Sequence, residues 1–224
     1  MSLRLVIPSR SEVDGELPVA RPWWQFSVRF NVAISQSVPV ARMHERDSEG
    51  VMMRWGLAQE SPGGRICFSR CGTVRSDTLQ SAQELRTAWL CGQRGIVPVA
   101  GFYLWQRISG GHQQPHYVRV VNRPVFGVAA LWLRAETSEG EVIESCAVIT
   151  VEVNALLAEM TTPNGQMPAI LHRNDYESWL SSSVSKARPL LLSYPRTQMV
   201  CHPVAPYVNY LEFDAPDLIK PARR

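Results

Sequence analysis

The sequence contains no apolar run of the roughly 18 to 20 residues that a membrane-spanning helix needs. It also lacks a recognisable secretory leader, because MSLRLVIPSRSEVDGE, the first stretch, holds only a very short apolar patch before acidic residues arrive. These absences exclude the usual membrane-spanning and secreted classes, so we expect a cytoplasmic protein without a membrane partner.

Cysteine is sparse and irregularly placed. The five residues are Cys67, Cys71, Cys91, Cys146 and Cys201. An odd and scattered set does not suit a disulfide framework, which agrees with a reducing compartment. Cys67 and Cys71 have C-x3-C spacing, but no second ligand pair with metal-site spacing appears. We therefore expect buried or idle thiols and no metal.

Three common signatures are also missing: G-x-G-x-x-G, G-x-x-x-x-G-K-[ST] and G-x-S-x-G. Strands and helices do not alternate along the chain, so nothing indicates a parallel nucleotide-binding sheet. The sequence consequently predicts no nucleotide cofactor, and no other cofactor is expected.

The composition is that of a well-buried globular domain. The chain has 224 residues, of which 45% are hydrophobic and 19% charged. A net charge of +3 permits a nucleic-acid partner without requiring one. Arg65, Arg70 and Arg75 fall in one glycine-flanked segment, GGRICFSRCGTVRSD. That segment is either a basic contact surface or a solvated loop with spaced arginines.

Short alternating and β-branched segments predict many strands. They are residues 26–34, 38–43, 51–58, 95–107, 116–121, 125–134, 145–153 and 198–204. A hairpin turn is expected at Gly110-Gly111. One helix is predicted at 77–89, capped by Ser76 or Asp77, with shorter helices at 154–160 and 173–182. These elements predict a single α+β domain over residues 1–224 with a curved, mostly antiparallel, barrel-like sheet and an irregular segment at 1–25.

The stretch GIVPVAGFYLWQ, residues 95–106, raises the question of function most directly. It has the character of a strand entering a site, since a glycine allows close approach to the backbone and a tryptophan offers a flat face. Nothing in it ionises between Arg94 and Arg107. It is therefore either a core strand or a chemical site without its acid.

Seven blocks, in order, resemble the SOS-response-associated peptidase (SRAP) family, whose members handle abasic sites in single-stranded DNA. The blocks are RFNVAISQSVPVAR, MRWGL, TVRSDT, GIVPVAGFYLWQ, QMPAIL, HPVAPYVN and DLIKP. Each is weak alone, but their common order covers residues 29–221. The resemblance implies an SRAP-like fold, a role in the DNA-damage response, and single-stranded or abasic-site DNA as partner.

The family chemistry implied by this resemblance starts at a cysteine exposed by removal of the initiator methionine. The α-amine, with a pKa of about 8, attacks the ring-opened sugar aldehyde to form an imine. The thiol then closes a thiazolidine ring, which leaves a stable protein–DNA crosslink. An asparagine, a glutamate and a histidine in the family motifs orient groups and move protons.

This chain departs from the family at all four catalytic positions. Ser2 stands at the cysteine, Thr73 at the asparagine, Leu104 at the glutamate and Asn164 at the histidine. A hydroxyl is far less nucleophilic than a thiolate, and a leucine side chain can neither donate nor accept a proton. We therefore expect a pseudoenzyme, although a slow, reversible imine at the Ser2 amine stays open.

Four further positions match family residues at the DNA or lining the pocket. Arg4 and Arg75 occupy positions that contact phosphate in the family, and a guanidinium pairs bidentately with phosphate. Asn31 and Thr150 match positions that line the pocket. The alternative for the arginines is a structural ion pair, and for Asn31 and Thr150 a role in turns or strand ends. Glu84 stands near an expected basic contact, which weakens the expected affinity.

The aromatic residues and histidines give no defensible catalytic spacing. Trp55 and Trp105 lie in apolar strands and are expected in the core, with base stacking as the alternative. The adjacent Trp23 and Trp24 are expected as a lid over the core, with base stacking by one of them as the alternative. We interpret His112, His116 and His172 as surface or loop residues, and His202 as a supporting residue.

Three hypotheses follow from the sequence. The first is a divergent SRAP-like protein that binds single-stranded or abasic-site DNA without crosslinking it. The second is an interaction or regulatory protein that keeps the fold and binds no DNA. The third is a slow imine-forming DNA lyase acting through the Ser2 amine. The sequence leaves the oligomeric state open.

Overall fold

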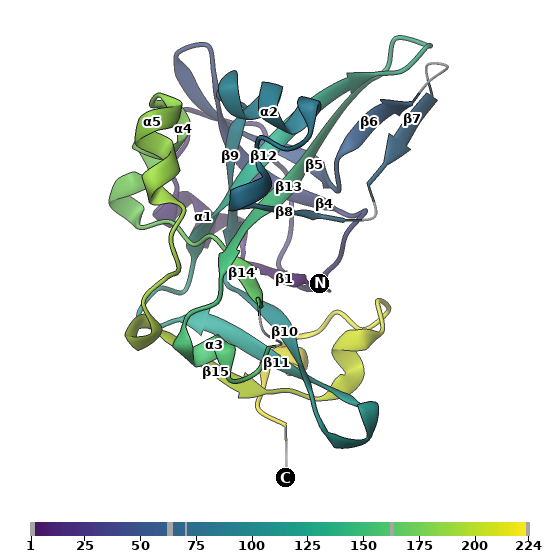
Figure 1. The fold of residues 1–224 in the computed structure, drawn as a ribbon, viewed down its shortest axis with the longest axis vertical. Helices are drawn as coiled ribbons and strands as arrows, with labels where there is room; N and C mark the ends of the chain where they lie inside the picture. The colour runs from purple at the N-terminus through teal and green to yellow at the C-terminus, as the bar shows by residue number, and fades with distance from the viewer. Residues whose placement is uncertain (1–2, 62–64, 70, 162–163, 223–224) are drawn as a thin grey trace.

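Two mostly antiparallel sheets organise the computed structural model, which describes residues 3–61, 65–69, 71–161 and 164–222 (Figure 1). The first sheet is wholly antiparallel. Its strands, in spatial order, are β15 (Met199–Pro203), β11 (Gln113–Val120), β10 (Gly101–Arg107), β1 (Arg4–Ile7) and β3 (Arg29–Val32).

The second sheet closes into a small barrel. Its strands, in order, are β14 (Gln166–Pro168), β13 (Val142–Glu152), β12 (Phe126–Glu136), β9 (Arg94–Val99), β4 (Ser37–His44), β5 (Asp47–Trp55) and β2 (Arg21–Pro22). A parallel pairing of β13 with β5 joins the two sides. The short strand β8 (Thr73–Arg75) also runs parallel to β13, while β6 (Ala58–Ser61) and β7 (Arg65–Phe68) form a projecting hairpin. The prediction of an α+β domain with a curved, mostly antiparallel sheet is confirmed.

The helices are short and lie around the barrel and between strands. The α-helices are α1 (Arg10–Glu16), α2 (Gln83–Leu90), α3 (Ala155–Ala158), α4 (Tyr176–Ser181) and α5 (Val184–Ala187). The 3-10 helices are η1 (Ser76–Thr78), η2 (Ser109–Gly111), η3 (Arg173–Asp175), η4 (Arg188–Leu190), η5 (Arg196–Gln198), η6 (Pro206–Asn209) and η7 (Pro216–Ile219). In the described part of the chain no helix has the length and apolar character to cross a bilayer.

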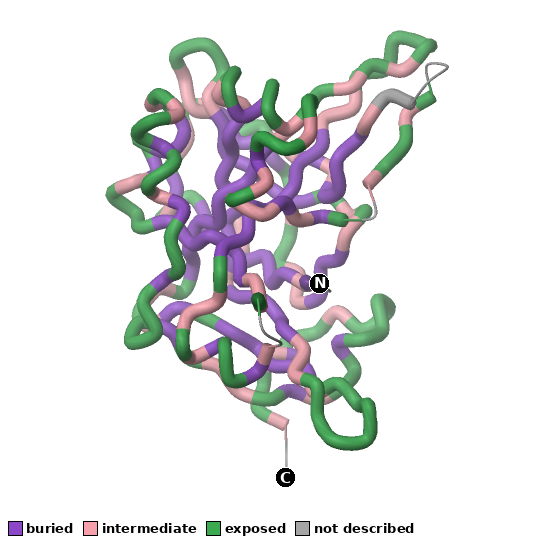
Figure 2. Tube along the Cα trace, viewed as in Figure 1, coloured by how far each residue is buried: buried purple, intermediate pink, exposed green. Residues whose placement is uncertain are grey.

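The hydrophobic core fills the barrel and continues onto one face of the five-stranded sheet (Figure 2). Four tryptophans, Trp24, Trp55, Trp89 and Trp179, are fully buried in it. A second, smaller cluster covers the other face of the five-stranded sheet. Its buried members are Val6, Tyr103, Tyr117, Val204, Val208 and Leu218. Burial of each large side chain contributes about 1.5 to 3 kcal/mol, so the second cluster fixes the C-terminal segment against β10 and β11.

The predicted strand 95–107 is in fact two strands that belong to different sheets. β9 ends at Val99 in the barrel and β10 starts at Gly101 in the five-stranded sheet. Between them, the Ala100 amide donates to the Val6 carbonyl at 2.8 Å. A β-carbon at Gly101 would come within 2.4 Å of the Tyr117 ring, so glycine permits the change of sheet.

Two local expectations were wrong. The segment 1–25 was predicted to be irregular, but its described part, residues 3–25, contains β1 and α1, and α1 begins with a capping box between Ser9 and Glu12. The helix predicted at 77–89 begins only at Gln83. Asp77 does not cap it because its carboxylate binds Arg75 instead.

Candidate functional site

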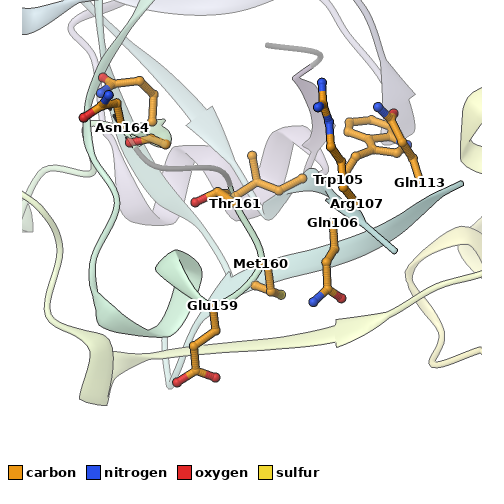
Figure 3. Close-up of a pocket in the computed structure, with 11 residues that line it drawn as sticks. Trp105, Gln106, Arg107, Gln113, Glu159, Met160, Thr161 and Asn164 are labelled. Atoms are coloured by element: carbon orange, nitrogen blue, oxygen red, sulfur yellow. Dashed lines mark hydrogen bonds between the residues drawn. The ribbon is translucent and has the colours of Figure 1, made fainter. Parts of the chain in front are cut away.

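An open groove follows the edge of β10 beyond the end of β1. In the described chain β1 pairs with β10 from Gly101 to Tyr103 only, so Leu104–Arg107 has no strand on that side. The groove has a volume of about 440 Å³ and its other wall is the segment after α3 (Figure 3). Its lining residues are Leu104, Trp105, Gln106, Arg107, Gln113, Glu159, Met160, Thr161, Asn164, Gly165 and Gln166.

Two of the four expected catalytic positions border this groove. Leu104 reaches it from β10 and is 2% exposed, and Asn164 reaches it from the opposite wall. Asn164 has a φ of 66°, a left-handed conformation that asparagine tolerates better than most residues. The groove therefore has a leucine side chain on one wall and an asparagine side chain on the other. Ser2, the third position, lies outside the described residues.

Thr73, the fourth position, lies on β8 and does not line the groove. It is opposite Val148 of β13, and its hydroxyl is 3.4 Å from the Cys71 sulfur. Cys71 also donates to the Thr73 carbonyl at 3.2 Å. The structure therefore brings Leu104 and Asn164 together and sets Thr73 on a separate strand.

The charges on the groove are few. Glu159 carries the only carboxylate among the described lining residues, and Figure 3 shows it at the far end from Asn164 and directed away from Thr161. Arg107 is exposed, and no ion pair or hydrogen bond of its side chain is found within the described residues. The groove thus offers a free cation and several amides, which suit a polar or anionic ligand better than proton transfer.

Leu104 has a histidine directly opposite it on the neighbouring strand. The register of β10 and β11 sets Leu104 against His116, so both side chains lie on the same face of the sheet. His116 is 8% exposed, and its Nδ1 donates to the Gln114 carbonyl at 3.1 Å. Burial lowers the pKa of His116, an effect that the charge of His202 reinforces and the Gln114 hydrogen bond opposes. The expectation of a surface or loop histidine was wrong for His116.

The retained arginines are each engaged within the chain. Arg75 makes a two-pronged ion pair with Asp77, with nitrogen–oxygen distances of 2.9 and 2.6 Å. The hydrogen bond from Arg75 lowers the pKa of Asp77. Arg4 donates to the Asn31 side-chain oxygen at 3.3 Å, and desolvation lowers its pKa. Arg75 therefore has to exchange a carboxylate for a phosphate before it can contact DNA.

Asn31 and Thr150 are buried and bind the chain itself. The Asn31 amide donates to the carbonyls of Val208, Tyr210 and Phe213 at 3.2, 2.9 and 2.9 Å. Thr150 is 1% exposed, lies opposite Arg75 of β8, and donates to the Val74 carbonyl at 3.5 Å. These contacts match the alternative role in turns and strand ends.

The tryptophans divide between core and surface. Trp24 and Trp55 are fully buried, as expected of a lid residue and a core strand, whereas Trp23 is 68% exposed. Trp105 departs from the expected core role. It is half-buried, lines the groove, and donates from its indole nitrogen to the Asn209 side chain at 2.8 Å.

The sequence interpretation overlooked the loop that Trp105 contacts. Tyr207, Tyr210, Leu211 and Phe213 are all exposed there. The signal was present as four large apolar residues within YVNYLEF, a run too short and too interrupted by polar residues for a buried helix or strand.

Comparisons with known sequences give a family model and several named relatives. A family model described as SOS response associated peptidase (SRAP) matches residues 8–211. The Abasic site processing protein YoqW of Bacillus subtilis is 25% identical over 202 residues, which cover 89% of this chain and 88% of that protein. The Abasic site processing protein HMCES of Rattus norvegicus is 28% identical over 246 residues, which cover 92% of this chain and 69% of that protein.

Solved structures share the fold. A protein from Bordetella bronchiseptica superimposes with a TM-score of 0.76 at 22% identity, covering 92% of this chain and 100% of that one. A protein from Bacteroides thetaiotaomicron has a TM-score of 0.73 at 24% identity, covering 84% and 82%. The arrangement of sheets and barrel is therefore common to these chains.

Proposed function

This chain belongs to the SOS response associated peptidase (SRAP) family, and from that premise we propose that it binds single-stranded DNA containing abasic sites without forming a covalent crosslink. Relatives across most of its length are named abasic site processing proteins, which supports a function related to DNA damage. The departure from crosslinking rests on the residues of this chain.

The observation that carries the proposal is Leu104 at the groove. The carbinolamine formed by an amine and an aldehyde loses water to give the imine, and a ring then closes, only when protons are delivered and removed; positioned acid–base groups contribute about 10² to 10⁴ in rate. Leu104 delivers none. The carboxamide of Asn164 does not titrate, and Glu159 faces away from it.

His116 does not replace the missing acid. Its Nδ1 proton is held by the Gln114 carbonyl, so the neutral ring presents only a lone pair at Nε2. Burial lowers its pKa, which favours the neutral ring over the imidazolium. A neutral imidazole in that tautomer accepts a hydrogen bond at Nε2, whereas protonation of a leaving hydroxyl needs a donor.

The groove keeps features that suit noncovalent binding of a strand. Arg107 provides a cation for phosphate, and the amides of Gln113, Asn164 and Gln166 can donate to phosphate or to base edges. Arg4, on the strand that pairs with β10, and Arg75, on β8 beside β13, are further cations. Together they support salt-dependent binding, in which affinity falls as counterions compete.

The test is an electrophoretic shift with a single-stranded oligonucleotide that carries one abasic site. It is run across a salt series, with and without borohydride. A shift that weakens steeply with salt and leaves no reducible adduct agrees with the proposal. No shift at low salt contradicts it and favours a regulatory protein that binds no DNA. A reducible adduct lost on blocking the N-terminal amine favours an imine-forming lyase.

Two variants locate the binding surface. Arg107→Ala removes the groove cation, and Arg188→Ala removes an exposed arginine of η4, which directly follows α5 and does not line the groove. We expect the salt slope to fall by about one for Arg107→Ala and to stay unchanged for Arg188→Ala. Equal effects of the two variants would place binding elsewhere on the chain.

A further inference from the structure

We propose that the loop after β15 is a stacking platform for the bases of the bound strand. We call its large, exposed apolar residues the aromatic platform; they are Tyr207, Tyr210, Leu211 and Phe213. The inference rests on the proposed function and names a second part of the DNA surface, beside the groove. Large apolar side chains gathered in one exposed place mark an interaction site in proteins.

The platform is exposed and its rings contact one another. Tyr207 is 56% exposed, Tyr210 54% and Phe213 46%. The Tyr207 and Phe213 rings lie 5.4 Å apart between centroids, and the Tyr210 and Phe213 rings 6.2 Å apart. Flat faces of this kind accept any base, because every base has a π face.

The platform is held rigidly from below. Asn31 donates to the carbonyls of Val208, Tyr210 and Phe213, so one buried side chain fixes three points of the loop. Asp214 accepts from the backbone amides of Phe30 and Asn31 at 2.5 and 3.1 Å, and also from Arg29. A surface ordered before binding loses little entropy when a base stacks on it.

The loop also has a buried anchor. Val208 is fully buried and Leu218 is 4% exposed, both within the second hydrophobic cluster. Within the turn, the Tyr210 amide donates to the Tyr207 carbonyl at 3.1 Å and the Phe213 amide to the Tyr210 carbonyl at 3.2 Å. Apolar residues therefore point both inward and outward, and only the inward ones are needed for folding.

The platform continues from the groove. Trp105 lines the groove and donates to Asn209, which is part of η6 between Tyr207 and Tyr210. Arg4 binds the same Asn31 that holds the loop. A strand seated along β10 thus meets cations at Arg4 and Arg107 and then aromatic faces at the loop.

Single-stranded DNA suits this surface better than a protein partner does. The carbonyls that a docking β-strand would use are already taken by Asn31. Asp214 is neutralised by Arg29, which leaves Glu212 as the exposed acid within 206–214. Aromatic faces beside a cationic track are the arrangement that single-strand binders use.

The experiment measures affinity for two oligonucleotides of equal length. One carries a single abasic site between normal nucleotides, and the other carries base-free tetrahydrofuran residues at all flanking positions. The wild type is compared with Tyr210→Ala/Phe213→Ala and with Tyr210→Trp/Phe213→Trp. Leu192→Ala, at an apolar residue 67% exposed elsewhere, is the matched control. Melting temperatures confirm that each variant folds.

We expect the alanine double variant to lose about tenfold or more in affinity for the normal oligonucleotide, at an unchanged salt slope. Removing the flanking bases should weaken the wild type to the same degree and leave the alanine variant unaffected. The tryptophan variant should retain affinity, because the bases stack on flat aromatic rings and the tyrosine hydroxyl is not required. Leu192→Ala should bind as the wild type does.

The outcomes separate this inference from the proposed function. No binding by the wild type at low salt would overturn both. If the wild type binds DNA but the alanine variant binds with the same affinity, the platform alone is overturned. The same conclusion follows if the wild type binds the base-free oligonucleotide as tightly as the normal one. The inference is supported if the alanine variant binds the normal oligonucleotide more weakly than the wild type does, and if removing the flanking bases weakens binding by the wild type only.

Discussion

Leu104 of β10 and His116 of β11 lie directly opposite each other, and Leu104 lines the groove. A carboxylate at position 104 would therefore meet an imidazole across the strands. In this chain the imidazole faces an aliphatic side chain instead, and burial lowers the pKa of His116, which favours the neutral ring. The pair explains why the groove binds without reacting in our proposal.

Restoring the four family residues should restore crosslinking. The variant Ser2→Cys/Thr73→Asn/Leu104→Glu/Asn164→His supplies a thiol, an amide, a carboxylate and an imidazole at positions where the resemblance implies them. We expect a permanent adduct with abasic single-stranded DNA, visible on a denaturing gel without borohydride. Each acid–base group is worth roughly 10² or more in rate, so the single variants should stay inactive.

The control for this restoration is the triple variant that keeps Ser2. It should form at most a borohydride-dependent adduct, because a hydroxyl closes no stable ring. A permanent adduct from the wild type, or none from the quadruple variant when it is folded and binds DNA, would contradict the assignment of these positions.

Freeing Arg75 should strengthen DNA binding. Its guanidinium is held by Asp77 through two hydrogen bonds, on a half-exposed strand end. Asp77→Asn removes the competing charge, so we expect affinity for single-stranded DNA to rise severalfold and the salt slope to steepen by about one. Fluorescence anisotropy across a salt series measures both.

The matched control for Asp77→Asn is Asp14→Asn, which breaks the exposed Arg10–Asp14 pair of α1. Stability should change little in either variant, because exposed ion pairs contribute little. If Asp14→Asn raised affinity as much as Asp77→Asn, the gain would reflect net charge and not a phosphate contact by Arg75.

The barrel and the site differ in how far the sequence predicted them. Strand positions followed from alternation, and the ordered motifs identified the family. The division of 95–107 at Ala100 was not predictable, because it depends on Val6 accepting the Ala100 amide from a distant strand. The helix start at Gln83 was missed since Asp77 pairs with Arg75 and not with the helix.

The Leu104–His116 pair shows why register was the hardest feature. Glycines at 110 and 111 do form the turn, each with a φ of 78°. A two-residue turn there would set Leu104 against Tyr117. The observed loop spans 108–112, between the paired residues Arg107 and Gln113, and shifts the register by one. A one-residue shift moves every side chain of the partner strand to the other face, which brought His116 to the same face as Leu104.

Asn31 should be essential for the stability of the C-terminal loop. Asn31→Ala leaves three buried or half-buried carbonyls without their donor. We expect a loss of at least about 2 kcal/mol in the free energy of unfolding, because each unsatisfied group costs about 1 to 3 kcal/mol. Chemical denaturation checks this, with the exposed Asn174→Ala as control. A loss no larger than that of the control would mean that the loop is held by Val208 and Asp214.

Stability should fall between pH 7 and pH 5 because of His116. Burial lowers its folded-state pKa below the ordinary value of 6.5, with His202 reinforcing the effect and the Gln114 carbonyl opposing it. The unfolded chain therefore binds more protons in this window, so the folded state loses stability as pH falls through 6.5. His116→Gln removes this contribution, and its denaturation midpoint should depend less on pH than that of the wild type.

His112→Gln, at an exposed histidine of the hairpin loop, should keep the wild-type dependence. Parallel pH profiles for His116→Gln and the wild type would show that His116 is not the buried titrating group, and the neutral imidazole opposite Leu104 would lose its support.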